Sequence, residues 1–391
     1  MKKILSLLML GVMVISVGCA GTKPEDSNPI DEGADAGKVI KIGVFEPMTG
    51  ANAAGGEMEV EGIRLANELY PEVNGMKVEL VIADNKSDKV EAANAATMLI
   101  EKENVTAIIG SWGSSLSIAA GPIILDAQIP TVGASCTNPL VTIGNDYYQR
   151  VCFIDSFQGT VMAKYAFESL DAKKAAIIQE ISSDYSVGLV KYFNDAFIAL
   201  TNDENAIVGT ANYSTGDQDF SAQLSNIKKL DADVIFAPGN YTESALLIKQ
   251  ARELGITTPI IGGDTWEAPE FLEIGGEAVE GAAFSTFFTS DVPITKESEV
   301  FLNAYREKYD KEPASVTALG YDAYIVILDA IKRSGSTDPV KIQEALAQTV
   351  DFEGAAGMIS LDINGDAIKS AVIKKVENGV FKYMATVDPI K

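Results

Sequence analysis

The sequence predicts an α/β protein in which two similar halves each hold a parallel sheet covered by helices on both faces. Short apolar runs of strand length alternate with stretches of helical length, and the whole alternation occurs twice along the chain. The length of 391 residues suits two domains of about 150 residues each. Apolar strands separated by helices are typical of parallel sheets that are buried on both sides.

The first series of elements opens with a strand at 39–45. It continues with a helix at 55–69, a strand at 78–82, a helix at 88–101, a strand at 105–109, a helix at 115–127 and a strand at 129–132. Asp88 and Glu91 have the spacing of a capping box, which predicts that the second of these helices begins at Asp88.

The second series follows residues 150–155 and repeats the pattern. It contains a helix at 157–170, a strand at 175–179, a helix at 185–200, a strand at 207–212, a helix at 218–230, a strand at 234–237, a helix at 242–254 and a strand at 259–262. Open parallel sheets bind ligands at the carboxyl ends of their strands, so two such sheets that face each other create a cleft. Function is therefore expected in the loops after Phe45, Gly110, Val132, Gln179, Ala237 and Gly262.

The composition excludes several classes of function. Lys and Arg number 31 against 55 Asp and Glu, a formal net charge of −24, so the clustered cations that nucleic acid binding needs are missing. The absence of His removes Ser-His-Asp hydrolysis and His-based zinc chemistry. Walker, Gly-x-Ser-x-Gly and paired CxxC motifs are also absent, so we expect no enzyme activity, no cofactor and no metal.

The first residues have the pattern of a lipoprotein signal peptide. Lys2 and Lys3 precede an apolar run at 4–17 that is short for a transmembrane span, and Ser-Val-Gly-Cys19 resembles a bacterial lipobox. We expect residues 1–18 to be removed and Cys19 to be lipidated, which would anchor the protein to the cell membrane outside the cytoplasm. A generic signal peptide with an incidental Cys is the alternative. Residues 19–37 are polar and contain Gly and Pro, which predicts a flexible tether.

Two further cysteines, Cys136 and Cys152, lie in the expected folded part. An extracytoplasmic location permits a disulfide between them. Sequence does not show whether their Cα atoms approach to about 6 Å, so two buried free thiols are the alternative.

Five segments together resemble a known family. They occur in order and at fitting intervals: Ile42-Gly-Val-Phe-Glu-Pro-Met-Thr-Gly50, Ile108-Ile-Gly-Ser-Trp-Gly-Ser-Ser115, Ser135-Cys-Thr-Asn-Pro139, Arg150-Val-Cys-Phe-Ile-Asp-Ser-Phe-Gln-Gly159 and Gln250-Ala-Arg-Glu-Leu-Gly255. From about Lys38 to Lys391 the chain is similar to the leucine/isoleucine/valine-binding proteins of bacterial ABC importers, a branch of the type I periplasmic binding proteins.

The resemblance implies a clamshell of two Rossmann-like lobes joined by a three-crossing hinge. Lobe 1 would comprise residues 38–154 and 287–370, and lobe 2 residues 155–286 and 371–391. It further implies a monomeric lipoprotein that binds an amino acid, branched-chain or larger, between the lobes and delivers it to ABC permease subunits. A sensor that presents an amino acid or amide to a receptor is the alternative.

The strand-end loops offer groups for both charges of an α-amino acid, which a dehydrated cleft must satisfy. Ser114 and Ser115 follow a predicted strand and open a helix, so their N–H groups and hydroxyls can bind a carboxylate. Capping of the helix by one Ser is the alternative. The resemblance implies that Ser135 and Thr137 contact the carboxylate and the ammonium, and a Ser/Thr turn before Pro139 is compatible with that role.

The ammonium needs a fixed anion, and Asp264 follows a predicted strand and two glycines. The resemblance implies that Asp264 is the acid of lobe 2 that binds the ammonium and that Tyr185 closes over the bound amino acid. A solvated Asp and a half-buried aromatic at a helix start are the alternatives.

Two positions depart from the family's pattern. Gly55 stands where leucine-binding relatives commonly have an aromatic residue, and Asn240 replaces a tyrosine that contacts the ligand. Both exchanges remove bulk, and Trp112 and Trp266 flank the predicted charge sites, so we expect a roomier pocket that accepts side chains larger than leucine. The alternative is that both indoles pack into the bases of their loops, away from the ligand.

Overall fold

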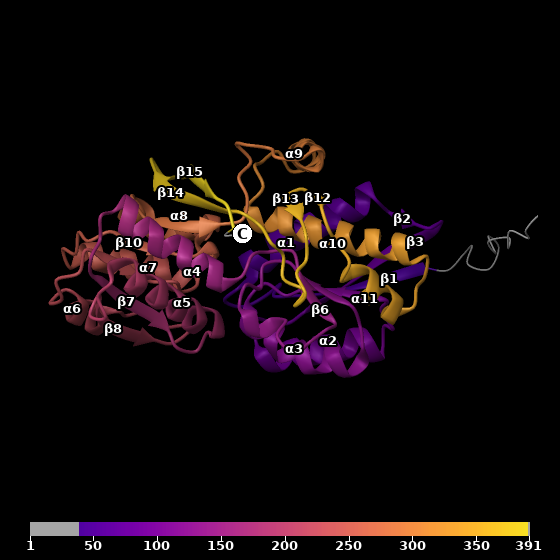
Figure 1. Cartoon of the computed structure of the whole chain (residues 1–391), viewed down its shortest axis with the longest axis horizontal. Helices are drawn as coiled ribbons and strands as arrows, with labels where there is room; N and C mark the ends of the chain where they lie inside the picture. Colours follow the sequence, from indigo (N-terminus) through magenta and orange to yellow (C-terminus); the bar gives the residue numbers. More distant parts are fainter. Residues whose placement is uncertain (1–38, 390–391) are drawn as a thin grey trace, which may run out of the picture. The chain divides into compact units, whose positions relative to one another are not determined.

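Two sheets form the framework of the computed structural model, which describes residues 39–389 (Figure 1). The first sheet has six strands in the order β2-β3-β1-β4-β5-β6. All neighbours are parallel except β2, which runs antiparallel to β3. The strands are β1 (Val39–Glu46), β2 (Glu72–Val73), β3 (Met76–Asp84), β4 (Ala107–Ile109), β5 (Thr131–Gly133) and β6 (Tyr148–Arg150).

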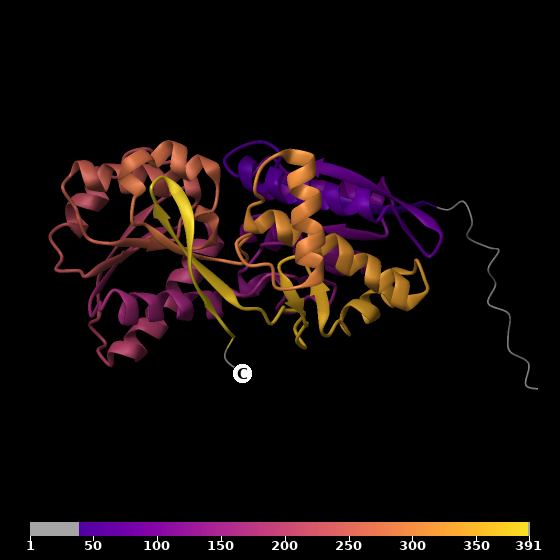
Figure 2. The same ribbon diagram turned by 90° about the horizontal axis from the view of Figure 1, so that it is seen from above.

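Helices cover both faces of this sheet because its strands are apolar on both sides. In β1, Ile42 and Val44 enter one core, whereas the adjacent Phe45 enters another. The first core receives α1 (Ala53–Leu69) and α10 (Ser315–Ser334), and the second receives α2 (Lys89–Glu101) and α3 (Ser114–Ala127). Figure 2 shows the amber α10 in the same lobe as the indigo α1, and the two helices pack against each other although they are far apart in the sequence.

The second sheet has seven strands in the order β15-β14-β11-β10-β9-β7-β8. β7 to β11 are parallel, whereas β14 is antiparallel to both of its neighbours. The strands are β7 (Ala175–Glu180), β8 (Ile207–Tyr213), β9 (Val234–Phe236), β10 (Ile260–Gly262), β11 (Ala283–Thr286), β14 (Ala371–Glu377) and β15 (Val380–Val387).

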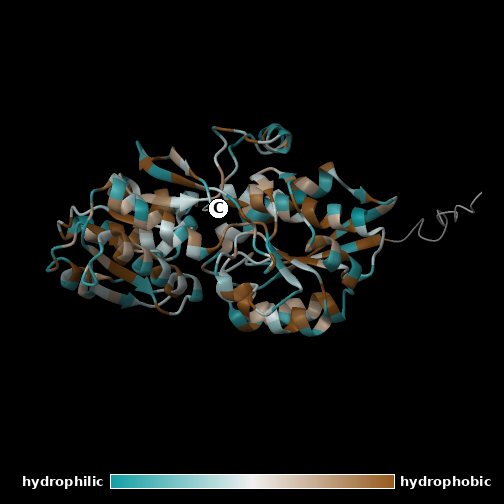
Figure 3. Ribbon diagram, viewed as in Figure 1, coloured by the Kyte–Doolittle hydropathy of each residue, from teal (hydrophilic) through white to brown (hydrophobic). Residues whose placement is uncertain are grey.

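Helices also pack on both faces of the second sheet. Ile177 and Ile178 of β7 enter two different cores. One core receives α4 (Asp155–Lys164) and α5 (Asp184–Thr201); the other receives α6 (Ser221–Ile227), α7 (Tyr241–Glu253) and α8 (Pro269–Gly275). In Figure 3 the central strands are largely brown, and teal residues gather on the surrounding helices and loops, as burial of apolar side chains requires.

We name the first sheet with its helices lobe 1 and the second sheet with its helices lobe 2. The chain passes from β6 to α4, returns after β11 to α9 (Lys296–Tyr309), α10 and α11 (Pro339–Leu346), and enters lobe 2 again at β14. In Figure 1, β14 and β15 lie near β10 and α8, whereas β12 (Phe352–Gly354) and β13 (Gly357–Ile359) lie near α10. The predicted fold, two α/β lobes joined by three crossings, is confirmed.

Buried ion pairs hold the segments near the crossings. They are Arg150 with Asp366 (2.7 Å), Lys369 with Asp322 (3.5 Å) and Lys374 with Glu267 (2.6 Å). A buried charge is tolerated when it is paired, so each pair fixes the two chain segments that it joins.

The helices and strands predicted up to β10 are present in the structure, although their exact ends differ. One helix changes its type near its end, and two short strands were not predicted. The helix expected at 157–170 ends at Lys164 and continues as a π-helix at Tyr165–Ser169. The short strands β2 and β6 were not predicted, because their residues, Glu-Val and Tyr-Gln-Arg, form no apolar run. Asp88 caps α2 as predicted and accepts hydrogen bonds from the N–H of Val90 (2.8 Å) and of Glu91 (3.0 Å).

Cys136 and Cys152 are buried free thiols, so the alternative to a disulfide holds.

The predicted signal peptide at 1–18, lipidated Cys19 and tether at 19–37 lie outside the described residues. Both lobes belong to one compact unit. Within the part of the chain that the structure describes, no helix combines the length and apolar character needed to cross a membrane.

Candidate functional site

A cavity of about 120 Å³ lies where strand-end loops of the two lobes meet. Every residue that lines it follows the carboxyl end of a strand or is the last residue of one, as expected for parallel sheets. The lining residues are Ala51, Asn52, Ser87, Lys89, Trp112, Gly113, Ser114, Ser115, Leu116 and Ser135 of lobe 1, and Glu180, Ser182, Ser183, Tyr185, Thr215, Asn240, Asp264 and Thr265 of lobe 2. The cavity thus brings together all predicted ligand-binding residues except Gly55 and Thr137.

The N-terminus of α3 forms part of the lobe 1 wall. Its N-cap is Gly113, so no side chain covers the first turn, where Ser114 and Ser115 lie. Ser114 Oγ accepts a hydrogen bond from the N–H of Asn138 (3.1 Å), and Ser115 Oγ accepts one from the N–H of Asp184 in lobe 2 (2.9 Å). The first N–H groups of a helix have no partner within the helix, so this end is suited to a carboxylate.

Ser135 lies on the same wall and is backed by an acid. Its hydroxyl donates a hydrogen bond to Oε1 of Glu59, which is completely buried in α1. Thr137 is also completely buried, and its carbonyl accepts a hydrogen bond from the N–H of Asp155 (3.0 Å). The structure therefore places Ser135 on the cavity wall and Thr137 behind it, near the passage of the chain into lobe 2.

Asp264 forms the acidic wall of lobe 2. It follows β10 as the first residue of a 3-10 turn, and only 4% of it is exposed. Its Oδ1 accepts hydrogen bonds from the Tyr185 hydroxyl (2.9 Å) and the Gln158 amide (2.6 Å). Gly263 is needed for this arrangement, because a Cβ at that position would overlap the Tyr185 hydroxyl.

No Lys or Arg among residues 39–389 forms an ion pair with Asp264. Burial raises the pKa of Asp264 to about 6, although the hydrogen bonds from Gln158 and Tyr185 act in the opposite direction. Burial, followed by the charge of Asp264, also raises the pKa of the neighbouring Asp155 well above its ordinary value. A cationic group in the cavity would compensate these acids, so this wall is suited to an ammonium.

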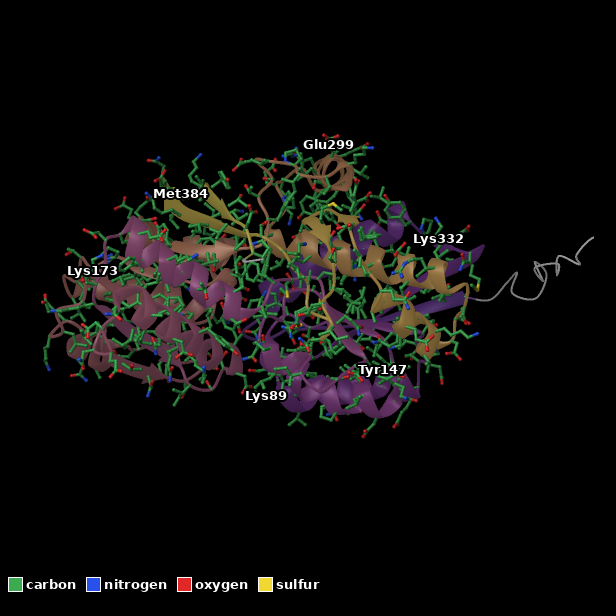
Figure 4. All side chains as sticks on the ribbon, in the orientation of Figure 1. Lys89, Tyr147, Lys173, Glu299, Lys332 and Met384 are labelled. Carbon is green, nitrogen blue, oxygen red and sulfur yellow. The ribbon has the colours of Figure 1, made fainter. Side chains whose placement is uncertain are left out.

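Hydrogen bonds join the two lobes at the rim of the cavity. Asp184 pairs with Lys89 at 2.8 Å, and its carbonyl accepts a bond from Asn138 Nδ2 (2.7 Å). Lys89 is labelled in Figure 4. Asn240, the N-cap of α7, donates from Nδ2 to the carbonyl of Ala51 in lobe 1 (3.2 Å). The lobes are therefore in contact around the cavity.

Trp112 packs against Gly55 at the lobe 1 wall. A Cβ at position 55 would overlap the indole, so the glycine allows the ring to lie against α1. The ring meets that of Tyr241 edge to face, with 6.1 Å between centroids, and the backbone N–H of Trp112 donates to Oε2 of Glu46 (2.6 Å). Trp112 fills the space that Gly55 leaves, which contradicts the expectation of a roomier pocket at this wall.

Trp266 does not reach the cavity. It is completely buried in lobe 2, where it stacks on Phe271 with 4.9 Å between ring centroids and lies beside Phe284. The expectation that this indole flanks the ammonium site is wrong, because the ring turns into the base of its loop.

Sequence reasoning missed several residues of the site. Glu46 and Glu180 are buried acids that each end a mostly apolar strand, and this break in the pattern was a signal. Glu180 lines the cavity and accepts hydrogen bonds from the Thr215 hydroxyl and the Asn240 N–H. Glu59 and Gln158 lie within helices and had no comparable local signal.

A helix N-terminus and a buried acid that face each other between two α/β lobes define a class, that of two-lobed solute-binding proteins. The family model described as "Periplasmic binding protein" matches residues 39–379, and the chain belongs to this family. Its members bind solutes and are not enzymes.

The relatives identify the branch of the family. The chain is 47% identical to the leucine-binding protein LivK from Thermotoga maritima, with a TM-score of 0.87. The match covers 90% of this chain and 99% of LivK. LivJ from Streptococcus pneumoniae, solved in complex with isoleucine, is 34% identical at a TM-score of 0.83, with coverage of 90% and 99%. The leucine-, isoleucine-, valine-, threonine- and alanine-binding protein of Pseudomonas aeruginosa is 29% identical over 85% of this chain and 88% of its own length. The family indicated by the sequence motifs, that of the leucine/isoleucine/valine-binding proteins, is confirmed.

Proposed function

We propose that this protein is the extracytoplasmic binding protein of an ABC importer and that its cavity binds an α-amino acid with a short aliphatic side chain. The observation that carries this proposal is the pairing of charges across the cavity. The N-terminus of α3 would bind the α-carboxylate, and Asp264 would bind the α-ammonium. A micromolar Kd corresponds to about −8 kcal/mol, which two satisfied charges and a buried side chain can supply.

The other residues of the cavity complete this assignment. Ser114 and Ser115 present N–H groups to the carboxylate, and the Ser135 oxygen accepts a hydrogen bond from the ammonium. Tyr185 closes over the ligand while it orients Asp264. Thr137 supports the carboxylate wall from behind, where it is buried.

The wall built by Trp112 and Gly55 supports the choice of a short aliphatic side chain. The indole occupies space next to α1 that a larger ligand would need, and the Asn240 amide is held by hydrogen bonds to the rim. The relatives from T. maritima and S. pneumoniae are described with leucine and isoleucine. Leucine, isoleucine and valine are therefore the proposed ligands.

Ligand binding would act on the equilibrium between open and closed lobes. With lobe 1 as residues 38–154 and 287–370, and lobe 2 as 155–286 and 371–391, each lobe alone holds only half of the charge contacts. The ligand therefore favours the closed form, in which both halves reach it. The closed monomer would then deliver the amino acid to the permease subunits, while a lipid on Cys19 and the tether at 19–37 keep it at the membrane.

Calorimetric titration of the chain that begins after Cys19, against the twenty amino acids, tests the proposed ligand. We expect leucine, isoleucine and valine to bind at micromolar Kd or tighter, and phenylalanine and tyrosine to bind at least about tenfold more weakly. The 2-hydroxy analogue of leucine, which lacks the ammonium, is the control and should not bind measurably. Failure of every amino acid to bind, or equal binding of leucine and phenylalanine, would contradict the proposal.

Metabolic labelling with a radioactive fatty acid tests the anchor. The full-length chain should incorporate label and sediment with membranes, and Cys19→Ala should do neither. A Cys19→Ala variant that still incorporates label would refute lipidation at this residue.

A further inference from the structure

Two completely buried carboxyl groups lie directly behind Ser135 in lobe 1. Glu46 is the last residue of β1 and Glu59 lies in α1, and the two side chains are within hydrogen-bonding reach of each other. Glu59 Oε1 accepts the hydrogen bond of the Ser135 hydroxyl, and Glu46 Oε2 accepts that of the backbone N–H of Trp112 (2.6 Å). Each acid therefore holds one residue of the cavity wall.

The remaining oxygens of the pair lack protein donors. Glu46 Oε1 and Glu59 Oε2 are buried without a hydrogen-bond partner in the part of the chain at 39–389, and no Lys or Arg there forms an ion pair with either acid. Two adjacent buried carboxylates cannot both be ionised at low cost, so the pair is expected to share one proton. Burial raises the pKa of Glu59 to about 8, and burial together with the Glu59 charge raises the pKa of Glu46 well above its ordinary value.

The groups that face the pair do not compensate its charge. Cys136, from the loop after β5, and Tyr148 of β6 are neutral, because burial raises the pKa of both side chains. Asp264 of lobe 2 adds negative charge across the cavity. Arg150, a buried cation that acts on the neighbouring Cys136, is already paired with Asp366 at 2.7 Å. The ammonium site therefore has two buried acids behind Ser135 on its lobe 1 side, in addition to Asp264 on the lobe 2 wall.

We propose that Glu46 and Glu59 are positioning residues of the ammonium site, which present negative charge through Ser135 and release their shared proton when an ammonium binds. The Ser135 hydrogen is already donated to Glu59, so the Ser135 oxygen faces the cavity as an acceptor. The positive charge of the ligand then stabilises the ionised form of both acids. The O–H bond of the pair breaks, and the proton passes to the solvent. This inference rests on the proposed binding of an α-amino acid. It extends recognition of the ammonium from Asp264 alone to Asp264, Glu46 and Glu59.

Calorimetric titration of the wild-type protein with leucine at pH 7.5, in buffers of different ionisation enthalpy, measures the released proton. We expect release of about half a proton or more per leucine. Asp264, with a pKa of about 6, is almost fully ionised at this pH and contributes little. Asp155, whose pKa is also raised, can contribute, and the Glu59→Gln variant separates its share from that of the pair. Binding of leucine without proton release would overturn the inference and leave the proposed function standing. If no amino acid binds, the proposed function itself fails.

Glu59→Gln keeps the shape of the side chain and removes the acid. It should remove the share of proton release at pH 7.5 that comes from the pair, so that at most the share of Asp155 remains, and weaken leucine binding by about tenfold. Glu243→Gln is the matched control, because Glu243 is a buried acid of lobe 2 that does not line the cavity; its affinity and proton release should stay unchanged. Glu46→Gln provides a second variant if thermal melting shows that Glu59→Gln is unfolded. Wild-type proton release in either folded variant would refute the shared proton.

Discussion

The two walls of the cavity have the same architecture and opposite chemistry. Both are built from loops at the carboxyl ends of parallel strands that helices cover on both faces. The lobe 1 wall presents a helix N-terminus with Ser114 and Ser115, whereas the lobe 2 wall presents Asp264, held by Tyr185 and Gln158.

The difference shows that the fold determines where the loops of each wall lie. The first residues after each strand determine which charge that wall presents to a ligand. After β4, a glycine N-cap leaves the N–H groups of α3 open toward the cavity. After β10, Gly263 allows Tyr185 to reach Asp264. A ligand with both a carboxylate and an ammonium is complementary to this pair of walls, and one with a single charge is not.

The largest effect is expected from neutralising the lobe 2 wall. Asp264→Asn should weaken leucine binding by about 100-fold or more, because the ammonium loses its buried anion. The same change should raise the thermal stability of the ligand-free protein at pH 7 by about 1 to 3 kcal/mol. The pKa of Asp264 is raised in the folded state, so its ionised form costs stability at pH values above that pKa. Titration calorimetry and thermal melts check the two effects, and unchanged affinity would remove Asp264 from the site.

Replacing Trp112 should alter the selectivity between amino acids more than the overall affinity for them. Trp112→Ala opens the space beside Gly55, so the affinity for phenylalanine relative to leucine should rise by about tenfold. Trp266→Phe is the matched control, because that indole is buried away from the cavity. Competition binding with labelled leucine measures the ratio, and an identical ratio in Trp112→Ala and the wild type would show that the indole does not limit the ligand.

Lowering the pH should weaken binding through the same acidic wall. As the pH falls below about 6, Asp264 takes up a proton in the empty protein and must lose it again to pair with the ammonium. Leucine affinity at pH 5 should therefore be about tenfold or more below that at pH 7. Leucine keeps both of its charges over this range. Constant affinity between these pH values would show that the ammonium does not meet a buried acid.

The smallest effect is expected from the contact that joins the walls at the rim. Lys89 and Asp184 are 51% and 41% exposed, so their ion pair is screened by solvent. Partial burial favours the neutral form of Asp184, but hydrogen bonds from Lys89 and Ser115 lower its pKa overall. Lys89→Met should weaken leucine binding by about twofold to threefold at low salt and less at high salt.

Lys191→Met, which removes an exposed intrahelical pair with Asp195, is the control and should leave binding unchanged. A loss above about tenfold in Lys89→Met would show that this lysine contacts the ligand itself.

The sequence by itself determined the α/β class, the two series of elements and the strand-end loops in which the cavity lies. These features depend on local patterns, since apolar runs, caps and the residues after a strand occupy contiguous stretches of chain. Ser114, Ser115 and Asp264 could be predicted as residues of the strand-end loops that line the cavity for this reason, whereas the roles that the family resemblance implies for them stay predictions.

Only the tertiary structure decided how those loops are supported and filled. Trp112 fills the space at Gly55, Glu59 backs Ser135, and Gln158 orients the acid of lobe 2. Each of these contacts joins elements that are distant in the sequence. Which side chains meet there is set by the packing of sheets and helices against each other, and no local pattern of residues records it.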